Sequence, residues 1–134
     1  MRIVLDASVA VAAVRPREPS HRPSRLRVSR VLRGLDDIVV PALFSVEVGA
    51  ALARAGEDMS AVQAYVESLL GAAETVVSLG PRAAGRARET AMRWRLRAAD
   101  AVYVSLAVHE GIPLCTLDRE VLARAGGACR VVSP

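Results

Sequence analysis

Four acidic residues are the strongest candidates for chemistry in this sequence. Asp6 and Asp118 directly follow short apolar runs. Glu47 lies between two valines, and Asp100 precedes an apolar helical segment. An aspartate at such a position commonly caps the following helix. A glutamate with apolar neighbours is different, because a charged group is seldom fully buried without a partner. We therefore favour a shared role over four unrelated caps.

Bringing these carboxylates together requires positive charge. Two carboxylates about 4 Å apart repel by roughly 4 kcal/mol at an effective dielectric constant near 20. Arginines, protons or a divalent metal could supply the compensation. A site made of these carboxylates, without histidine or cysteine ligands, favours a hard ion, Mg²⁺ or Mn²⁺. Such an ion suits hydrolysis of a phosphodiester, in which it orients a water and neutralises the leaving oxygen.

The basic residues point to a phosphate-bearing substrate. The net charge is +4 and every basic residue is an arginine, a side chain that grips phosphate with paired hydrogen bonds. Three arginines form a helical stripe leading to Asp100, and a fourth follows Asp118. We predict that these four bind substrate: Arg86, Arg93, Arg97 and Arg119. A basic rim beside an acidic site is typical of a nuclease.

Other phosphate-handling classes lack their required residues. The chain contains no lysine, which argues against P-loop, Schiff-base and response-regulator chemistry. A haloacid-dehalogenase-like phosphatase also needs a second acid two residues after the first, where this chain has Ser8. A dinucleotide-binding domain needs a glycine-rich turn after the first strand, and Val9-Ala10-Val11 supplies none.

The elements that position these residues follow from the hydrophobic pattern. Short apolar runs predict strands at 2–6, 38–40, 75–77 and 113–117, with a short fifth at 130–132. Helical patterns cover 9–14, 20–34, 43–54, 58–71, a segment opened by Pro81, and 99–110. Alternating helices and continuously apolar strands predict a mostly parallel sheet with helices on both faces. If the first and fourth strands are neighbours, Asp6 and Asp118 share the crevice at their carboxyl ends.

The predicted helix 20–34 is amphipathic and basic. Its inward positions are Val28, Val31, Leu32 and Leu35. Its outer face carries Arg22, Arg25, Arg27, Arg30 and Arg33. Three interpretations remain open for this face: a solvated surface, an RNA-binding patch, or a surface for an acidic protein segment.

Length and cysteine content set the wider context. A chain of 134 residues predicts one domain, residues 1–134. No apolar run approaches the roughly 20 residues of a membrane helix, and no secretory signal precedes the first strand, so we expect a soluble cytoplasmic protein. Cys115 and Cys129 lack metal-site spacing, and we expect both to be buried and reduced.

Four segments in order resemble the PIN-domain family, most closely its VapC type. They are Asp6-Ala7-Ser8, the isolated Glu47, the block 96–107 around Asp100, and Thr116-Leu117-Asp118. The resemblance implies a three-layer α/β/α fold and a metal-dependent endoribonuclease whose four acids bind Mg²⁺ or Mn²⁺. Ser8 and Thr116 match positions where the family often has a supporting hydroxyl. The family is usually homodimeric and inhibited by a small cognate antitoxin.

Two alternatives stay within this resemblance. One is a housekeeping PIN nuclease for RNA processing, although such proteins often carry further domains. The other is a non-catalytic RNA-binding or scaffold module, which is expected to lack one or more of the acids, whereas all four are present here. An upstream reading frame for a short charged antitoxin would distinguish the toxin from the housekeeping enzyme.

Overall fold

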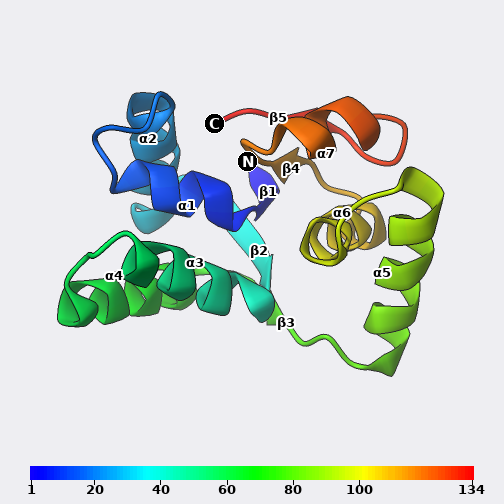
Figure 1. Ribbon diagram of the computed structural model, residues 1–134, viewed down its shortest axis with the longest axis horizontal. Helices are drawn as coiled ribbons and strands as arrows, with labels where there is room; N and C mark the ends of the chain where they lie inside the picture. Colours follow the sequence, from blue (N-terminus) through cyan, green and yellow to red (C-terminus); the bar gives the residue numbers. More distant parts are fainter.

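The structure is a computed structural model that describes residues 1–134 (Figure 1). The elements in chain order are β1 (Arg2–Leu5), α1 (Ala7–Ala13), α2 (His21–Leu32), β2 (Asp37–Pro41), α3 (Leu43–Arg54), α4 (Met59–Ala72), β3 (Thr75–Val77), α5 (Pro81–Trp94), α6 (Ala98–Glu110), β4 (Leu114–Cys115), α7 (Arg119–Arg124) and β5 (Val131–Val132). Most predicted elements are confirmed to within a few residues.

The five strands form one parallel sheet in the order β3-β2-β1-β4-β5. In the register of the central pairs, Ile3 lies opposite Ile38 and Leu5 opposite Cys115. The chain runs from β1 toward one edge and later returns to the other side of β1. The topological switch point therefore lies between β1 and β4, where an open parallel sheet binds ligands.

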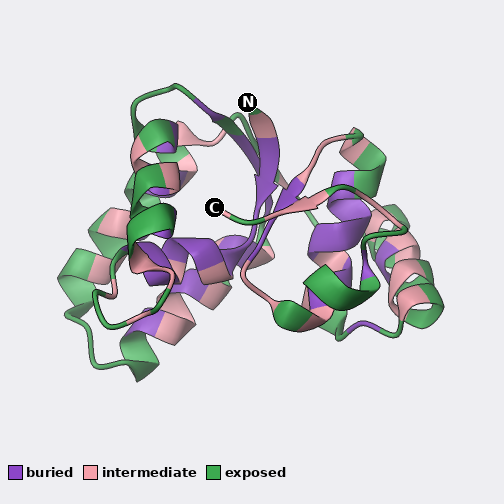
Figure 2. Cartoon of the chain, turned by 90° about the horizontal axis from the view of Figure 1, so that it is seen from above, coloured by how far each residue is buried: buried purple, intermediate pink, exposed green.

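Helices cover both faces of the sheet, which gives the three-layer α/β architecture predicted above. Helices α1 to α4 pack against one another, whereas α5 packs on α6, and α6 lies against β1, β2 and β4. Figure 2 shows the buried strands between these two groups of helices. Burial on both faces explains why Ile3, Val4 and Leu5 are fully inaccessible and why the strand reads as a continuous apolar run.

The predicted helix boundaries rest on recognisable capping residues. Asp58 caps α4 by accepting a hydrogen bond from the amide of Ala61 at 2.9 Å. Gly111 ends α6 at φ +65°, a left-handed conformation that glycine adopts without steric cost. Pro81 occupies the first turn of α5, where its missing N–H costs no hydrogen bond.

Near the C-terminus one sequence prediction is wrong and one helix was missed. The fourth strand is shorter than 113–117, since only Leu114 and Cys115 form it. The helix α7 was not predicted, because it is only 6 residues long. Its start depends on Asp118, whose Oδ1 accepts hydrogen bonds from the amides of Glu120 and Val121 at 2.8 and 3.1 Å.

The prediction for α2 holds only in part. Val28 and Val31 are buried, but Leu32 and Leu35 are 46% and 55% exposed. Arg27 and Arg30 do not belong to a free basic face, because both bind the buried carboxylate of Asp36. The helix ends at Leu32, so the positions beyond it no longer follow the helical period.

Two smaller findings concern membrane and redox expectations. No helix combines the length and the apolar composition needed to cross a bilayer. Cys115 is buried and Cys129 is half-buried, and both thiols are free. Burial raises the pKa of the Cys115 thiol to about 11, which keeps it protonated and unreactive at neutral pH.

Candidate active site

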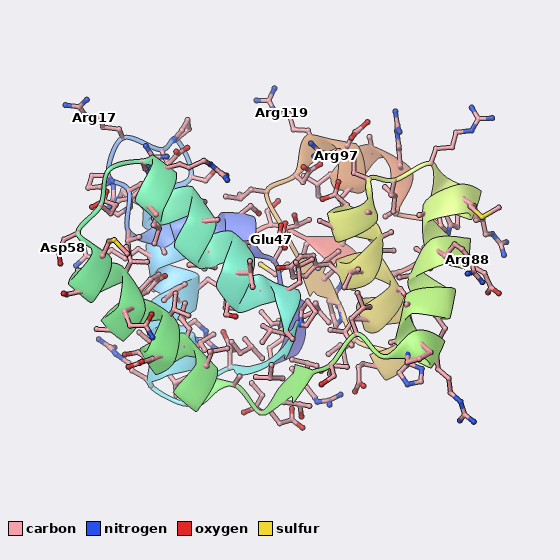
Figure 3. The ribbon with its side chains drawn as sticks, turned by 60° about the horizontal axis from the view of Figure 1, so that its bottom comes forward. Arg17, Glu47, Asp58, Arg88, Arg97 and Arg119 are labelled. Carbon is pink, nitrogen blue, oxygen red and sulfur yellow. The ribbon has the colours of Figure 1, made fainter.

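The four predicted acids line one cleft, at the switch point of the sheet. The cleft has a volume of about 660 Å³, and its charged lining residues include Asp6, Glu47, Arg97, Asp100 and Asp118. Asp6 follows β1 and Asp118 follows β4, which are hydrogen-bonded neighbours. Figure 3 views the side of the molecule where Glu47 lies on α3 and Arg97 precedes α6. Four elements distant in sequence thus contribute to a single site.

Asp6 is the most enclosed of the acids, at 8% exposure. Its Oδ2 accepts hydrogen bonds from the hydroxyls of Ser8, at 2.8 Å, and of Thr116. The same hydroxyls bind the strand-end backbone, since Ser8 Oγ accepts from the amide of Leu117 and Thr116 Oγ1 from that of Asp118. Burial raises the pKa of Asp6, and the hydroxyl bonds oppose that shift. Ser8 and Thr116 therefore position this carboxylate.

Asp118 both caps a helix and faces the cleft, so the two roles considered from the sequence are not exclusive. Its Oδ1 caps α7, while its Oδ2 faces the cleft and accepts a 2.7 Å hydrogen bond from Arg97 Nη2. The cap fixes the orientation of the side chain. One oxygen is consequently held toward the other acids.

Arg97 lies among the carboxylates and bridges them. Its Nε donates to Asp100 at 3.0 Å, its Nη2 donates to Asp118, and Nε lies 3.6 Å from Glu120. The Arg97 side chain is 67% exposed, so it can leave without disturbing the core. We predicted that Arg97 binds substrate phosphate; here its guanidinium supplies the positive charge that the clustered acids require.

Glu120 is a site residue that the sequence prediction missed. Carboxylate oxygens of Asp100, Asp118 and Glu120 lie within 4.8 Å of one another, close enough to share a metal ion. In sequence Glu120 looks like a first-turn acid that stabilises a helix dipole. Asp118 could have been recognised in the sequence as a helix cap. Glu120 would then lie in the first turn of that helix, close to the Asp118 carboxylate.

Glu47 is half-buried on α3, and one of its carboxylate oxygens, Oε1, is inaccessible and has no hydrogen-bond partner. The hydroxyl of Tyr103 lies near this carboxylate and lowers its pKa. Burial is the largest cause that raises the pKa of Glu47, and the charges of Asp6 and Asp100 raise it further. An orphaned buried oxygen is rare in native proteins and indicates a missing water or ion.

Asp100 experiences the same shortage of positive charge. Burial raises its pKa most, and the charges of Asp118 and Asp6 add to the shift, while Arg97 opposes it. The two arginines that line the cleft, Arg54 and Arg97, do not balance its five acids, which are the four predicted ones and Glu18. The residues therefore fit a divalent cation, since all the donors are oxygens and one is unpartnered.

The other predicted arginines lie away from the acids. Arg86 and Arg93 line a second cleft, on the far side of α6. Arg119 is the first residue of α7, and its side chain is exposed and points outward in Figure 3. The helical stripe on α5 is real, but the turn between α5 and α6 directs only Arg97 into the acidic cleft.

Comparison with known proteins agrees with this architecture. A family model described as the PIN domain matches residues 3–128, so the chain belongs to the PIN-domain family. No protein of curated function matches the sequence significantly.

Several solved structures share this fold. VapBC2 from Rickettsia felis, solved with a promoter DNA fragment, has a TM-score of 0.72 at 13% identity, covering 100% of this chain and 99% of that one. VapC20 from Mycobacterium tuberculosis, described as a Sarcin-Ricin loop cleaving toxin, has a TM-score of 0.73 at 19% identity, covering 90% and 93%. FitAcB from Neisseria gonorrhoeae has a TM-score of 0.69 at 19% identity, covering 98% and 96%.

Proposed function

We propose that the chain is a Mg²⁺- or Mn²⁺-dependent endoribonuclease and the toxin of a VapBC-type toxin–antitoxin pair. The observation that carries the proposal is the orphaned buried oxygen of Glu47, which lines a cleft with three aspartates. A structural cluster of caps would satisfy its own oxygens, and this one does not. The similar structures support the assignment, because one is described as a Sarcin-Ricin loop cleaving toxin and others are VapBC2 and FitAB bound to DNA fragments.

In this proposal the aspartates hold the ion and Glu47 handles the proton. Asp6, Asp100 and Asp118 supply the ligands, with Glu120 at the rim of the same cluster. A bound divalent ion would polarise a phosphate oxygen and offset the charge that develops on the leaving oxygen. Glu47, partly desolvated by burial at the cleft, would accept a proton from water.

The arginines near the cleft would position the phosphate. Arg97 would exchange its carboxylate partners for the scissile phosphate once an ion neutralises the acids. Arg119 lies exposed beside Asp118 and would reach the strand outside the cleft. Arginine suits both roles, because its planar guanidinium pairs with two phosphate oxygens at once.

Metal removal is the direct test of this proposal. We expect cleavage of single-stranded RNA in Mg²⁺ or Mn²⁺, loss of cleavage in EDTA, and recovery when excess Mn²⁺ is restored. An oligodeoxynucleotide of the same sequence serves as the substrate control and should stay intact. Undiminished RNA cleavage in EDTA would contradict the proposal, as would equal cleavage of DNA.

A partner test addresses the toxin assignment. Expression of the wild-type chain alone should arrest growth, and co-expression of a small charged protein encoded beside it should relieve the arrest. Such a partner would also be expected to co-purify, with the toxin as a homodimer. Growth arrest by a variant without the acids would separate toxicity from nuclease activity and argue against this assignment.

Removal of Arg97 should strengthen metal binding. Arg97→Gln deletes the cation that occupies Asp100 and Asp118, so an incoming ion no longer displaces it. We expect the Kd for Mn²⁺, measured by calorimetry without RNA, to fall by about three- to tenfold, in line with the modest strength of exposed ion pairs. Arg95→Gln, an exposed neighbour outside the cluster, is the control. Weaker Mn²⁺ binding in Arg97→Gln would contradict this role.

A further inference from the structure

A second cleft lies on the other side of α6 from the acids. Its volume is about 590 Å³, and its polar lining comes from Arg86, Glu89, Thr90, Arg93, Ser105 and His109. Ser105 and His109 follow Asp100 by five and nine residues, which at 3.6 residues per turn places them on the opposite face of the helix. Helix α5 and the loop after α7 complete the walls.

The wall of this cleft is built around the only tryptophan of the chain. Trp94 is half-buried, and its ring lies so close to Gly127 that a Cβ at that position would approach Cη2 to 2.6 Å. The guanidinium of Arg93 lies 5.6 Å from the centroid of the Trp94 ring, within the range of a cation–π interaction. Gly127 thus allows the ring its position, and the ring holds Arg93 at the rim.

The two arginines of the cleft are not neutralised by the protein. Neither Arg86 nor Arg93 takes part in an ion pair, although Glu89 lies between them on the same helix. By contrast, Arg30 and Arg97 are bound by carboxylates. The free guanidinium groups are donors that match phosphate oxygens, whereas the hydroxyl of Thr90 already donates to the carbonyl of Arg86.

A short basic connection joins this cleft to the acidic one. Arg93 lines the second cleft, Arg97 lines the first, and Arg95 is exposed between them. Four residues span at most about 14 Å of chain, so a few nucleotides of an extended strand would cover the distance. A chain of arginines at this spacing can follow one sugar–phosphate backbone.

We propose that the second cleft is a subsite for the backbone of the RNA substrate, to one side of the scissile bond. The inference rests on the proposed nuclease function and adds to it: Arg86 and Arg93 bind phosphates remote from the bond that is cut. The cleft then increases affinity for long RNA without taking part in the chemistry. An RNA too short to extend beyond the acidic cleft does not contact the second cleft.

Binding in a cleavage-deficient background tests the subsite separately from catalysis. The probe is a fluorescein-labelled single-stranded RNA of about 16 nucleotides, the upper site size of single-strand binders, added to Asp100→Asn protein in Mg²⁺. We expect Arg86→Gln/Arg93→Gln to raise the Kd about tenfold. The slope of log K against log salt should fall by about 1.4, since each lost phosphate contact accounts for roughly 0.7.

The matched control removes two arginines from the same helix outside the cleft. Arg82 and Arg88 are exposed and line neither cleft, so Arg82→Gln/Arg88→Gln makes the same change in net charge. We expect it to change the Kd by less than about twofold. An equal loss in both pairs would overturn the subsite, as would failure of the parent protein to bind this RNA. A change in oligomeric state specific to Arg86→Gln/Arg93→Gln would also overturn it and identify the surface as a contact between copies.

Kinetics with active protein distinguish failure of the subsite from failure of the proposed function. In Arg86→Gln/Arg93→Gln, KM for the long RNA should rise with kcat unchanged, and a trinucleotide substrate should be cleaved as by the parent. If the parent cleaves no RNA, the proposed function fails while the binding result still stands. If kcat falls and KM does not change, the arginines are not a remote binding site.

Discussion

Asp100→Asn is expected to lower the rate of RNA cleavage by at least about a thousandfold, to the level of the uncatalysed control. Asp100 faces Asp118 and Glu120 closely enough to share an ion with them, and it also contacts Arg97. The substitution keeps the shape of the side chain but removes its charge, so it weakens both ion binding and the electrostatic stabilisation of the transition state. Initial rates with a labelled RNA in Mn²⁺ would measure the effect.

Stability separates this catalytic effect from misfolding. The pKa of Asp100 is raised by burial and by the neighbouring charges of Asp118 and Asp6, so folding without metal disfavours its ionised form relative to the unfolded chain. Asp100→Asn should therefore leave the Tm unchanged or slightly higher without metal. A marked drop in Tm would assign the acid a structural role, and rapid cleavage by the variant would remove it from the site.

A matched aspartate provides the control. Asp37 is exposed and begins β2, at the end of the sheet opposite the cleft. Asp37→Asn makes the same chemical change and should preserve both the cleavage rate and the Tm. The comparison isolates the position of the carboxylate from the loss of one negative charge.

Asp36→Asn is expected to lower the free energy of unfolding by about 2–3 kcal/mol, which corresponds to a Tm drop of roughly 8 °C. The carboxylate of Asp36 is fully buried and accepts from Arg27, Arg30 and the N-terminal ammonium group at 2.8 to 3.1 Å. Breaking a fully buried pair typically costs 3–5 kcal/mol. The partners here are partly exposed, so water compensates them in part and the expected cost is smaller.

The pH dependence of this effect has a definite sign. Hydrogen bonds from Arg30 are the largest cause that lowers the pKa of Asp36 from its ordinary value of 3.8. A depressed pKa in the folded state contributes stability above the ordinary pKa, and that contribution is lost as the pH falls through the folded pKa. The difference in unfolding free energy between wild type and Asp36→Asn should be constant from pH 7 to about 5 and shrink below pH 4.

Denaturant unfolding measured by circular dichroism at several pH values would test this prediction. Asp37→Asn again serves as the neighbouring control, because its carboxylate forms no ion pair. An Asp36→Asn variant as stable as wild type would show that the network adds nothing measurable. A difference that grows below pH 4 would contradict the direction of the pKa shift.

The sequence alone predicted the sheet architecture and named four acids that line one cleft in the structure. Strands buried on both faces must be continuously apolar, so β1 and β2 could be predicted as strands of a parallel sheet. Chain order and the carboxyl-end rule then predicted that Asp6 and Asp118 share a crevice. Their adjacency was conditional on the pairing of β1 with β4, which the structure provides.

Only the tertiary structure decided which arginines pair with buried carboxylates and which remain free. Sequence spacing made Arg27 and Arg30 look like part of a free basic face, but the fold pairs them with the buried Asp36. It also made Arg86 and Arg93 look like neighbours of the acids, whereas α6 separates them from the acidic cleft. Spacing along one helix defines a face but not the element that this face meets.

Because local sequence does not specify tertiary neighbours, neither the position of Glu120 beside the acids nor the unpartnered oxygen of Glu47 could be predicted. A first-turn acid and a helical glutamate have ordinary local patterns, and only long-range packing brings Glu120 to Asp100 and leaves Glu47 Oε1 without a partner. Electrostatic energy depends on distances in space and on burial, neither of which local sequence specifies. Residue type therefore predicted which acids could bind a metal, and the fold decided which of them meet and how much charge is left uncompensated.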